Sequence, residues 1–297
     1  TFRPKDIRSY PPSHILFAPH SELWYNKRVA FIIAGSRGKK HEVSLRSLLY
    51  GIINAKLCNR RRNHMGRIVA IGGGDLQSNL PINRYIVGMD KKERHNLLFV
   101  GTASKDAEGY IDSIKTAFEQ LDCCVKALCL ATKEYTQKEM DELVEWADII
   151  YVGGGNTFYM MEVWRKYGLD RKLMEVYSND TAILTGISAG AMCWFDCGHS
   201  NSEVFWVNGN IGYGWVEQLL NIHPYAYCPH YEERIESFDK MITEKTIPGL
   251  AMESDTAFVE QNGKIKYIKC KESSNAYIFR NDKGTIVKEY VEMEIIG

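Results

Sequence analysis

The chain has 297 residues, of which 45% are hydrophobic and 25% charged, and its formal net charge is zero. This is the composition of an ordinary globular protein, and the length suits one large domain or two smaller ones. No apolar run approaches the roughly 18 residues that a membrane span requires, so we expect no membrane partner. The eight cysteines are scattered without a CxxC pair, which favours free thiols in the cytoplasm and argues against a metal site.

The first 64 residues differ in charge from the rest of the chain. They hold 13 Lys and Arg against only Asp6, Glu22 and Glu42, a net charge of +10, so the remainder carries −10. This segment lacks the regular pattern of a domain, and Met65 stands directly before the first clear strand. We therefore expect a basic extension over residues 1–64, either a transit-like leader or a gene-model artefact. Basic and aromatic residues do not recur there as in a nucleic-acid-binding module, so no nucleic-acid partner is expected.

From Met65 onward, short apolar runs alternate with amphipathic stretches. The apolar runs predict buried strands, and the stretches between them predict helices, one of them with a capping box at Thr136 and Glu139. The expected strands are 68–71, 97–100, 125–130, 148–152, 182–187 and 225–228, and the expected helices are 106–121, 136–146 and 157–167. This order predicts a mostly parallel α/β sheet with helices on both faces. After about residue 249, short strands and the hairpin signal Gln261-Asn262-Gly263 predict antiparallel strands near the C-terminus.

The most informative motif is Gly186-Ile187-Ser188-Ala189-Gly190, which lies between an apolar run and a helix-compatible stretch. The pattern G-x-S-x-G between a strand and a helix is the signature of a nucleophile elbow, whose small neighbours leave the serine hydroxyl exposed. The alternative is a glycine-rich turn whose serine only caps the following helix.

A serine nucleophile also needs hydrogen-bond donors for the oxyanion that it creates. The backbone N–H of Ala189, directly after the serine, is one expected donor. A second is expected from the loop Gly153-Gly154-Gly155-Asn156, which follows another strand, because glycines let the backbone approach a substrate closely. Asn156 is expected to cap the next helix. The loop lacks the motifs of nucleotide-binding loops, so no nucleotide is expected there.

The base should be a histidine, and three follow the serine: His199, His223 and His230. His230 is favoured because it ends the predicted strand 225–228, and catalytic loops lie at strand ends in parallel sheets. A third group must orient the imidazole and stabilise its cation. Glu253 and Asp255 both lie at the end of a following strand, and their spacing does not choose between them.

Three ordered motifs resemble those of the peptidase E family of serine peptidases, which includes aspartyl dipeptidase and the cyanophycinases. They are GGGNTF at 153–158, GISAGA at 186–191 and CPHY at 228–231. The resemblance runs from about Met65 to the C-terminus, so residues 65–297 would form the catalytic α/β domain. It implies a flavodoxin-like fold, related to class I glutamine amidotransferase domains, with a serine in place of the cysteine nucleophile.

The resemblance also implies roles for individual residues. Ser188 would be the nucleophile and His230 the base, with oxyanion donors at Gly155 and Ala189. Glu253 best matches the third, acidic member of the triad, with Asp255 as the alternative. Neither a metal nor an organic cofactor is implied.

Members of the family favour substrates with an aspartyl residue on the acyl side of the cleaved bond. An arginine would suit that carboxylate, and Arg234 and Asn156 are the candidate substrate contacts. The alternative for Arg234 is a solvated side chain on a charged helix. We therefore expect a dipeptidase that acts on small peptides. Alternatives are a cyanophycinase-type or isoaspartyl peptidase, or a non-catalytic binding protein that kept the fold; oligomers are possible.

Overall fold

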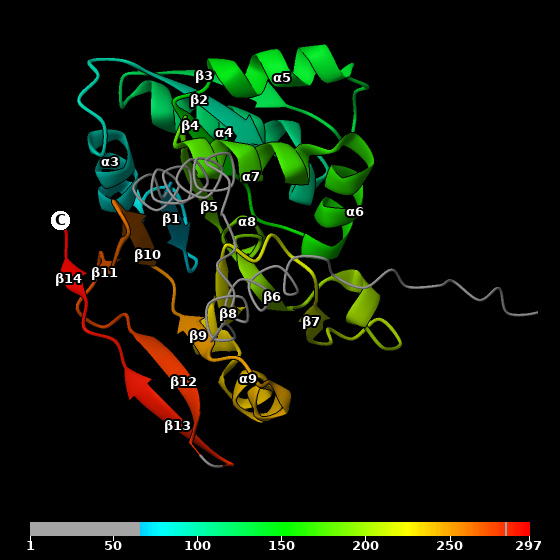
Figure 1. Ribbon diagram of the computed structural model, residues 1–297, viewed down its shortest axis with the longest axis vertical. Coiled ribbons are helices and arrows are strands. Elements are labelled where there is room, and N and C mark those ends of the chain that lie inside the picture. The colour runs from blue at the N-terminus through cyan, green and yellow to red at the C-terminus, as the bar shows by residue number, and fades with distance from the viewer. Residues whose placement is uncertain (1–65, 283) are drawn as a thin grey trace, which may run out of the picture. The chain divides into compact units, whose positions relative to one another are not determined.

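The computed structural model describes residues 66–282 and 284–297, so the expected extension over residues 1–64 lies outside the described part of the chain. Two sheets organise these residues (Figure 1). The larger has eight strands in the order β14-β11-β10-β1-β5-β4-β2-β3. Its parallel part consists of β1 (Arg67–Ile71), β2 (His95–Val100), β3 (Cys123–Leu128), β4 (Ile149–Val152) and β5 (Ile183–Ile187).

The succession β3-β2-β4-β5 is that of a flavodoxin-like sheet: from β2 the chain adds β3 on one side, and then β4 and β5 on the other. Strand β1 lies beyond β5. The parallel sheet and the flavodoxin-like fold are therefore confirmed. Antiparallel strands extend the sheet beyond β1, as the C-terminal pattern predicted. They are β10 (Thr256–Gln261) and β11 (Lys264–Lys269). The short β14 (Glu294–Ile295) then pairs parallel to β11 at the edge of the sheet.

A second sheet of six strands was not expected from the sequence. Its order is β13-β12-β9-β8-β6-β7, with β6, β8 and β9 parallel. The strands are β6 (Phe195–Ser200), β7 (Gly214–Val216), β8 (His223–Cys228), β9 (Gly249–Met252), β12 (Ala276–Asp282) and β13 (Thr285–Tyr290). The chain passes from this sheet back to the larger one between β9 and β10, which brings residues 253–255 to the junction of the two sheets.

Helices cover both faces of the larger sheet. Residues of β1 alternate between the two sides, with Val69 and Ile71 packed in one core and Ile68 and Ala70 in the other. The first core includes α3 (Leu80–Gly88) and α4 (Glu108–Glu119); the second includes α5 (Gln137–Trp146), α6 (Thr157–Tyr167) and α7 (Leu169–Asn179). The shorter helices are α8 (Ala189–Met192), α9 (Ile235–Met241), η1 (Thr102–Ser104), η2 (Glu203–Phe205), η3 (Tyr231–Glu233) and η4 (Ile242–Glu244).

Local signals placed several element ends correctly. Helix α5 begins with the predicted capping box, in which the Thr136 hydroxyl accepts from the N–H of Glu139 and the Glu139 carboxylate accepts from the N–H of Thr136. The predicted hairpin joins β10 to β11, with Gln261 opposite Lys264 and positive φ at both turn residues, Asn262 and Gly263.

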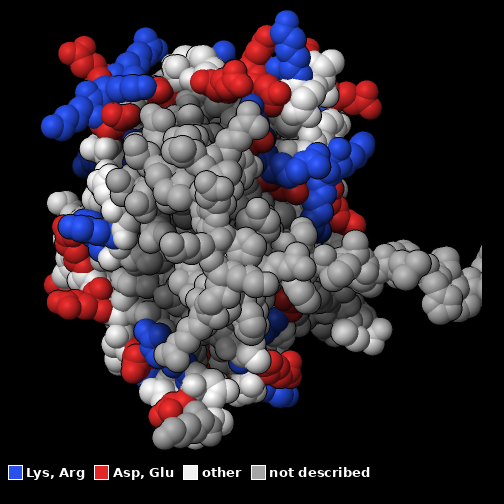
Figure 2. Space-filling view, viewed as in Figure 1, with Lys and Arg blue, Asp and Glu red and all other residues white. Residues whose placement is uncertain are grey.

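Where described residues can be seen in Figure 2, Lys and Arg side chains lie among Asp and Glu side chains. Among the described helices, none combines the length and the apolar composition that crossing a membrane would take.

Candidate active site

Ser188 stands on a strained turn between β5 and α8. Its backbone has φ 56° and ψ −113°, a conformation that non-glycine residues rarely adopt, and its N–H donates to the carbonyl of Ile71 at 3.1 Å. The side chain makes no capping hydrogen bond to the helix that follows, so the interpretation of Ser188 as a helix cap is wrong. Ser188 remains partly accessible, whereas the residues on either side of it are buried.

The two glycines of the motif are required by the close approach of backbone to backbone. A Cβ added to Gly186 would lie 2.3 Å from the carbonyl oxygen of Gly190. A Cβ added to Gly190 would lie 2.1 Å from the carbonyl oxygen of Val152, in the neighbouring strand β4. Both glycines therefore let the elbow fold tightly against β4.

The glycine loop after β4 lies against the serine. A Cβ added to Gly154 would be 3.4 Å from the Cβ of Ser188, and the N–H of Gly154 donates to the Tyr110 hydroxyl at 3.3 Å. Gly155 has φ 140°, and its N–H has no hydrogen-bond acceptor within the described residues. The Asn156 side chain accepts from the N–H of Tyr159 at 3.0 Å, which confirms it as the cap of α6.

His230 follows β8 and approaches the same strand end as Ser188. Its N–H donates to the carbonyl of Gly72 at 3.0 Å, one residue beyond the carbonyl that holds Ser188. The imidazole lies so close to Gly73 that a Cβ there would be 2.4 Å from Nδ1. The carbonyls of two consecutive residues, Ile71 and Gly72, thus hold the backbones of Ser188 and His230. The side chains of Ser188 and His230 do not hydrogen-bond to each other.

Electrostatics favour the neutral form of the His230 imidazole. Burial is the main cause that lowers its pKa below the ordinary value, and the nearby Arg234 guanidinium lowers it further. The carboxylates of Glu232 and Glu233 oppose this shift without reversing it. A neutral imidazole at pH 7 is the state that a general base requires.

The other two candidate histidines are engaged away from the elbow. Nε2 of His199 lies 2.9 Å from the hydroxyl of Ser237, and Nε2 of His223 lies 3.0 Å from the carboxylate of Glu260. Both rings are buried. This leaves His230 as the histidine that faces the end of β1.

The two acids expected behind the histidine bind other partners. A carboxylate oxygen of Glu253 accepts from the N–H of Asn275 at 2.8 Å, and the buried carboxylate of Asp255 pairs with Lys271. Neither carboxylate hydrogen-bonds to His230 within the described part of the chain. Burial raises the pKa of Glu253 above its ordinary value, despite the N–H of Asn275.

Two residues that the sequence did not suggest lie beside His230 instead. The Ser254 hydroxyl is 3.4 Å from Nδ1 of His230, and both carboxylate oxygens of Glu232 accept from the N–H of Ser254, at 3.1 and 3.2 Å. The one sequence signal for a role of these residues was position: Ser254 follows the candidate Glu253, and Glu232 lies just after His230. Spacing alone could not have separated Ser254 from its neighbours.

Arg234 is buried, with only 5% of its surface exposed, so the interpretation as a solvated arginine is wrong. One guanidinium nitrogen donates to the carbonyl of His199 at 2.8 Å, and the guanidinium lies 5.6 Å from the centre of the Tyr213 ring. A buried guanidinium needs several acceptors, and this is the one hydrogen bond it makes within the described residues.

His230, Glu232 and Glu233 each offer one ligand atom, and these atoms lie within 4.8 Å of one another. Within the described part of the chain, these three side chains form the one cluster whose spacing would allow it to hold a cation. Both carboxylates are exposed, and exposed acidic groups commonly stand close together without binding a metal.

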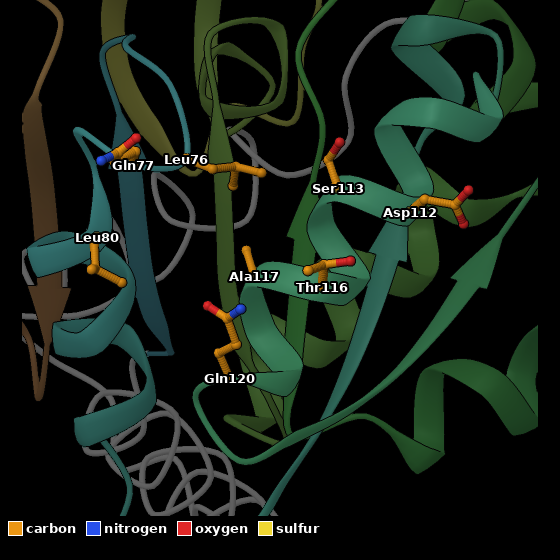
Figure 3. A pocket seen from close by; sticks show the side chains of 8 residues that line it. All are labelled: Leu76, Gln77, Leu80, Asp112, Ser113, Thr116, Ala117 and Gln120. Carbon is orange, nitrogen blue, oxygen red and sulfur yellow. The ribbon is translucent and has the colours of Figure 1, made fainter.

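A separate groove of about 600 Å³ lies between α3 and α4 (Figure 3). It shares no residue with the serine site. Its lining is mixed in polarity: Leu76, Gln77, Leu80, Asp112, Ser113, Thr116, Ala117 and Gln120.

A parallel α/β sheet with a serine on a strained elbow and a histidine at the adjoining strand end defines the class of α/β serine hydrolases. Comparison with known families agrees with this class. The model of peptidase family S51 matches residues 68–268. The chain therefore belongs to peptidase family S51, a family of serine peptidases, and the resemblance to the peptidase E family is confirmed.

Individual relatives are also peptidases by name. The chain is 34% identical to the uncharacterized peptidase YgaJ of Bacillus subtilis (strain 168) over 189 residues, which cover 61% of this chain and 76% of that protein. It is 23% identical to a probable alpha-aspartyl dipeptidase of Drosophila melanogaster over 200 residues, 64% of this chain and 78% of that protein. A peptidase from an acI-B1 actinobacterium shares the fold with a TM-score of 0.58 at 18% identity, covering 77% of this chain and 96% of its own.

Proposed function

We propose that this peptidase is a dipeptidase that cleaves small peptides after an N-terminal aspartyl residue, through a serine-bound acyl intermediate. The observation that carries the proposal is the Ser188 elbow, where a strained backbone presents a hydroxyl that caps no helix. The backbone N–H groups of Ser188 and His230 donate to the carbonyls of two consecutive residues, Ile71 and Gly72, at the end of β1. Strain of this kind persists only where the surrounding structure enforces it, and it gathers at functional sites.

The chemistry would proceed in two stages. His230 takes the proton of the Ser188 hydroxyl as Ser188 Oγ attacks the peptide carbonyl, and it gives that proton to the leaving amine. Water then attacks the acyl group, with His230 again acting as the base, and the free acid leaves. A water molecule is consumed, and one acid and one amine are released.

Two backbone N–H groups are proposed to bind the oxyanion. Ala189 is the first residue of α8, so its N–H has no partner within that helix. The N–H of Gly155 is unpaired within the described residues. The glycine loop lies close to Ser188, since a Cβ added to Gly154 would be 3.4 Å from the serine Cβ. Donors fixed before the reaction stabilise the oxyanion without reorganisation.

The acid of the triad remains a prediction, Glu253 or else Asp255. The preference for aspartyl substrates rests on Arg234 and on the distant Drosophila relative that is named an alpha-aspartyl dipeptidase. Arg234 is buried beside His230, and its guanidinium makes a single hydrogen bond within the described residues, so its remaining donors could bind a substrate carboxylate bidentately. Asn156 would contribute by holding the start of α6 next to the oxyanion donors.

A reducing compartment such as the cytoplasm suits this protein. The cysteines among the described residues are free thiols, and most are buried. Burial raises the pKa of Cys123 to about 11, which keeps its thiol protonated and unreactive.

Replacement of the nucleophile tests the proposal. Ser188→Ala should lower kcat/KM for Asp-Xaa dipeptides by about 10⁴-fold or more, because the covalent route is lost. Ser178→Ala is the matched control, since Ser178 is exposed and its hydroxyl donates to the carbonyl of Met174, away from the site. The assay panel should contain Asp-Leu, β-Asp-Arg, isoaspartyl and Ala-Leu dipeptides.

Each outcome of this panel has a meaning. Turnover of β-Asp-Arg or isoaspartyl peptides in preference to Asp-Leu would replace the dipeptidase assignment by one of the related activities. Equal turnover by the variant and the unaltered protein would remove Ser188 as the nucleophile. Turnover of no peptide by either protein would favour a binding protein.

A further inference from the structure

Two residues enclose the Nδ1 edge of the His230 ring. Gly73 lies so close to Nδ1 that no side chain could fit there, and the Ser254 hydroxyl lies 3.4 Å from Nδ1. When His230 accepts a proton at Nε2, Nδ1 must keep its own proton and donate it to a fixed acceptor. Ser254 Oγ is the side-chain acceptor that the structure offers there.

The position of Ser254 is itself held by a carboxylate. Both oxygens of Glu232 accept from the Ser254 N–H, so a residue of η3, directly after the histidine, holds the turn between β9 and β10. The carboxylates of the two neighbouring acids bind Asn275 and Lys271 instead. The Asp255 N–H donates to the carbonyl of Gly73, which further fixes this turn against the histidine.

The charges around the imidazole agree with this arrangement. The groups that act on His230 electrostatically are Glu232 and Glu233, which favour the imidazolium, and Arg234, which disfavours it. Glu253 and Asp255 are not among these groups. Glu232 therefore places a negative charge near the imidazole and also accepts a hydrogen bond from the backbone N–H of Ser254, the residue whose hydroxyl lies near Nδ1.

We propose that Ser254 and Glu232 position His230 in place of the acid predicted at Glu253 or Asp255, a proposal that rests on the serine peptidase function above and departs from its triad only at the third member. Nδ1–H of His230 donates to Ser254 Oγ, while Glu232 holds the Ser254 backbone and stabilises the imidazolium that forms during the reaction. No covalent bond changes at these residues. The 3.4 Å separation is long for a hydrogen bond, as is common without substrate, and it should shorten when substrate binds.

Four variants of the full chain separate this arrangement from a conventional acid. Ser254→Ala should lower kcat for Asp-Leu about 10- to 100-fold with little change in KM, the range typical of groups that orient a functional imidazole. Ser254→Thr keeps a hydroxyl and should recover most of the rate. Glu232→Gln should also lower kcat and should shift the acid limb of the rate profile to lower pH. Glu233→Gln is the matched control, since it removes a similar nearby charge but no bond to Ser254.

A second readout does not depend on turnover. In protein labelled with ¹⁵N-histidine, the His230 ring should show the Nδ1–H tautomer near pH 7, and Ser254→Ala should increase the fraction of the Nε2–H tautomer. The proposal is overturned if Ser254→Ala leaves both kcat and the tautomer unchanged. It is also overturned if Glu253→Gln or Asp255→Asn abolishes activity and changes the tautomer while the Ser254 variants do neither. If no peptide is hydrolysed, the peptidase proposal fails and the tautomer measurement still decides this one.

Discussion

At the scale of the residue, the chemistry of the site depends on two backbones in unusual conformations. Ser188 and His230 both have positive φ, at 56° and 49°. Each such conformation costs on the order of 1–3 kcal/mol and must be enforced by surrounding contacts. The carbonyls of Ile71 and Gly72 provide them, because each accepts the N–H of one of the two residues. The end of β1 thus aligns the proposed nucleophile and the proposed base, which are 42 residues apart in the sequence.

The lowered pKa of His230 predicts how activity depends on pH. The imidazole must be neutral to act as the base, and burial moves its pKa below the ordinary value of about 6.5. The acid limb of kcat/KM should therefore have its midpoint below pH 6.5, and activity should fall as the pH drops through it. A profile from pH 4 to 9 measures this midpoint. A flat profile down to pH 4, or a midpoint above pH 7, would contradict the role of His230.

At the scale of the element, the elbow depends on the packing of β5 and α8 against β4. Gly186 and Gly190 bring these three elements within contact of one another's backbones. The motif was recognisable in the sequence because both glycines have fixed spacing around the serine. The partner that they approach, Val152 of β4, could not be identified because it lies far away in the sequence.

Replacement of Gly190 should therefore destabilise the protein. The added methyl group of Gly190→Ala would lie 2.1 Å from the Val152 carbonyl oxygen, and neither backbone can move away easily. We expect a loss of about 3 kcal/mol in the free energy of unfolding. Gly88→Ala is the control, because Gly88 ends α3 and a Cβ there meets nothing within 4 Å. Urea unfolding compares the two, and equal stability of both variants would count against the tight elbow.

At the scale of the whole molecule, a buried histidine of the second sheet links the stability of the fold to pH. His199 of β6 is fully buried, stacks on Tyr213 at 4.9 Å and bonds Ser237. Burial lowers its pKa to about 3, and the Arg234 guanidinium contributes to the shift. The second sheet is thus built around an imidazole that must stay neutral.

This imidazole predicts a loss of stability in mild acid. The unfolded chain binds a proton at His199 below about pH 6.5, whereas the folded chain does so only near pH 3, so unfolding is favoured as the pH falls between these values. Between pH 6.5 and 5 this group should cost about 2 kcal/mol. His199→Gln should lose less stability than the unaltered protein over that interval in urea titrations at each pH. Parallel losses in the two proteins would show that His199 does not titrate in this way.

Much of the fold followed from local pattern. Apolar runs predicted the parallel strands, and the Thr136 box and the Asn156 cap placed the starts of α5 and α6 correctly. The second sheet was missed because its strands do not differ in pattern from those of the first. Which sheet a short strand joins depends on long-range pairing, such as that of β8 with β6 and β9.

The sequence by itself determined the family, the elbow and the histidine that follows β8, because each is carried by residues that are contiguous in the chain. Only the tertiary structure decided that Ser188 caps nothing, that Arg234 is buried, and that Ser254 faces His230 while Glu253 and Asp255 bind elsewhere. These facts depend on which way a side chain points at the junction of two sheets. In that turn, neighbouring residues point their side chains in different directions, and the spacing of residues in the sequence does not reveal which of them points toward His230.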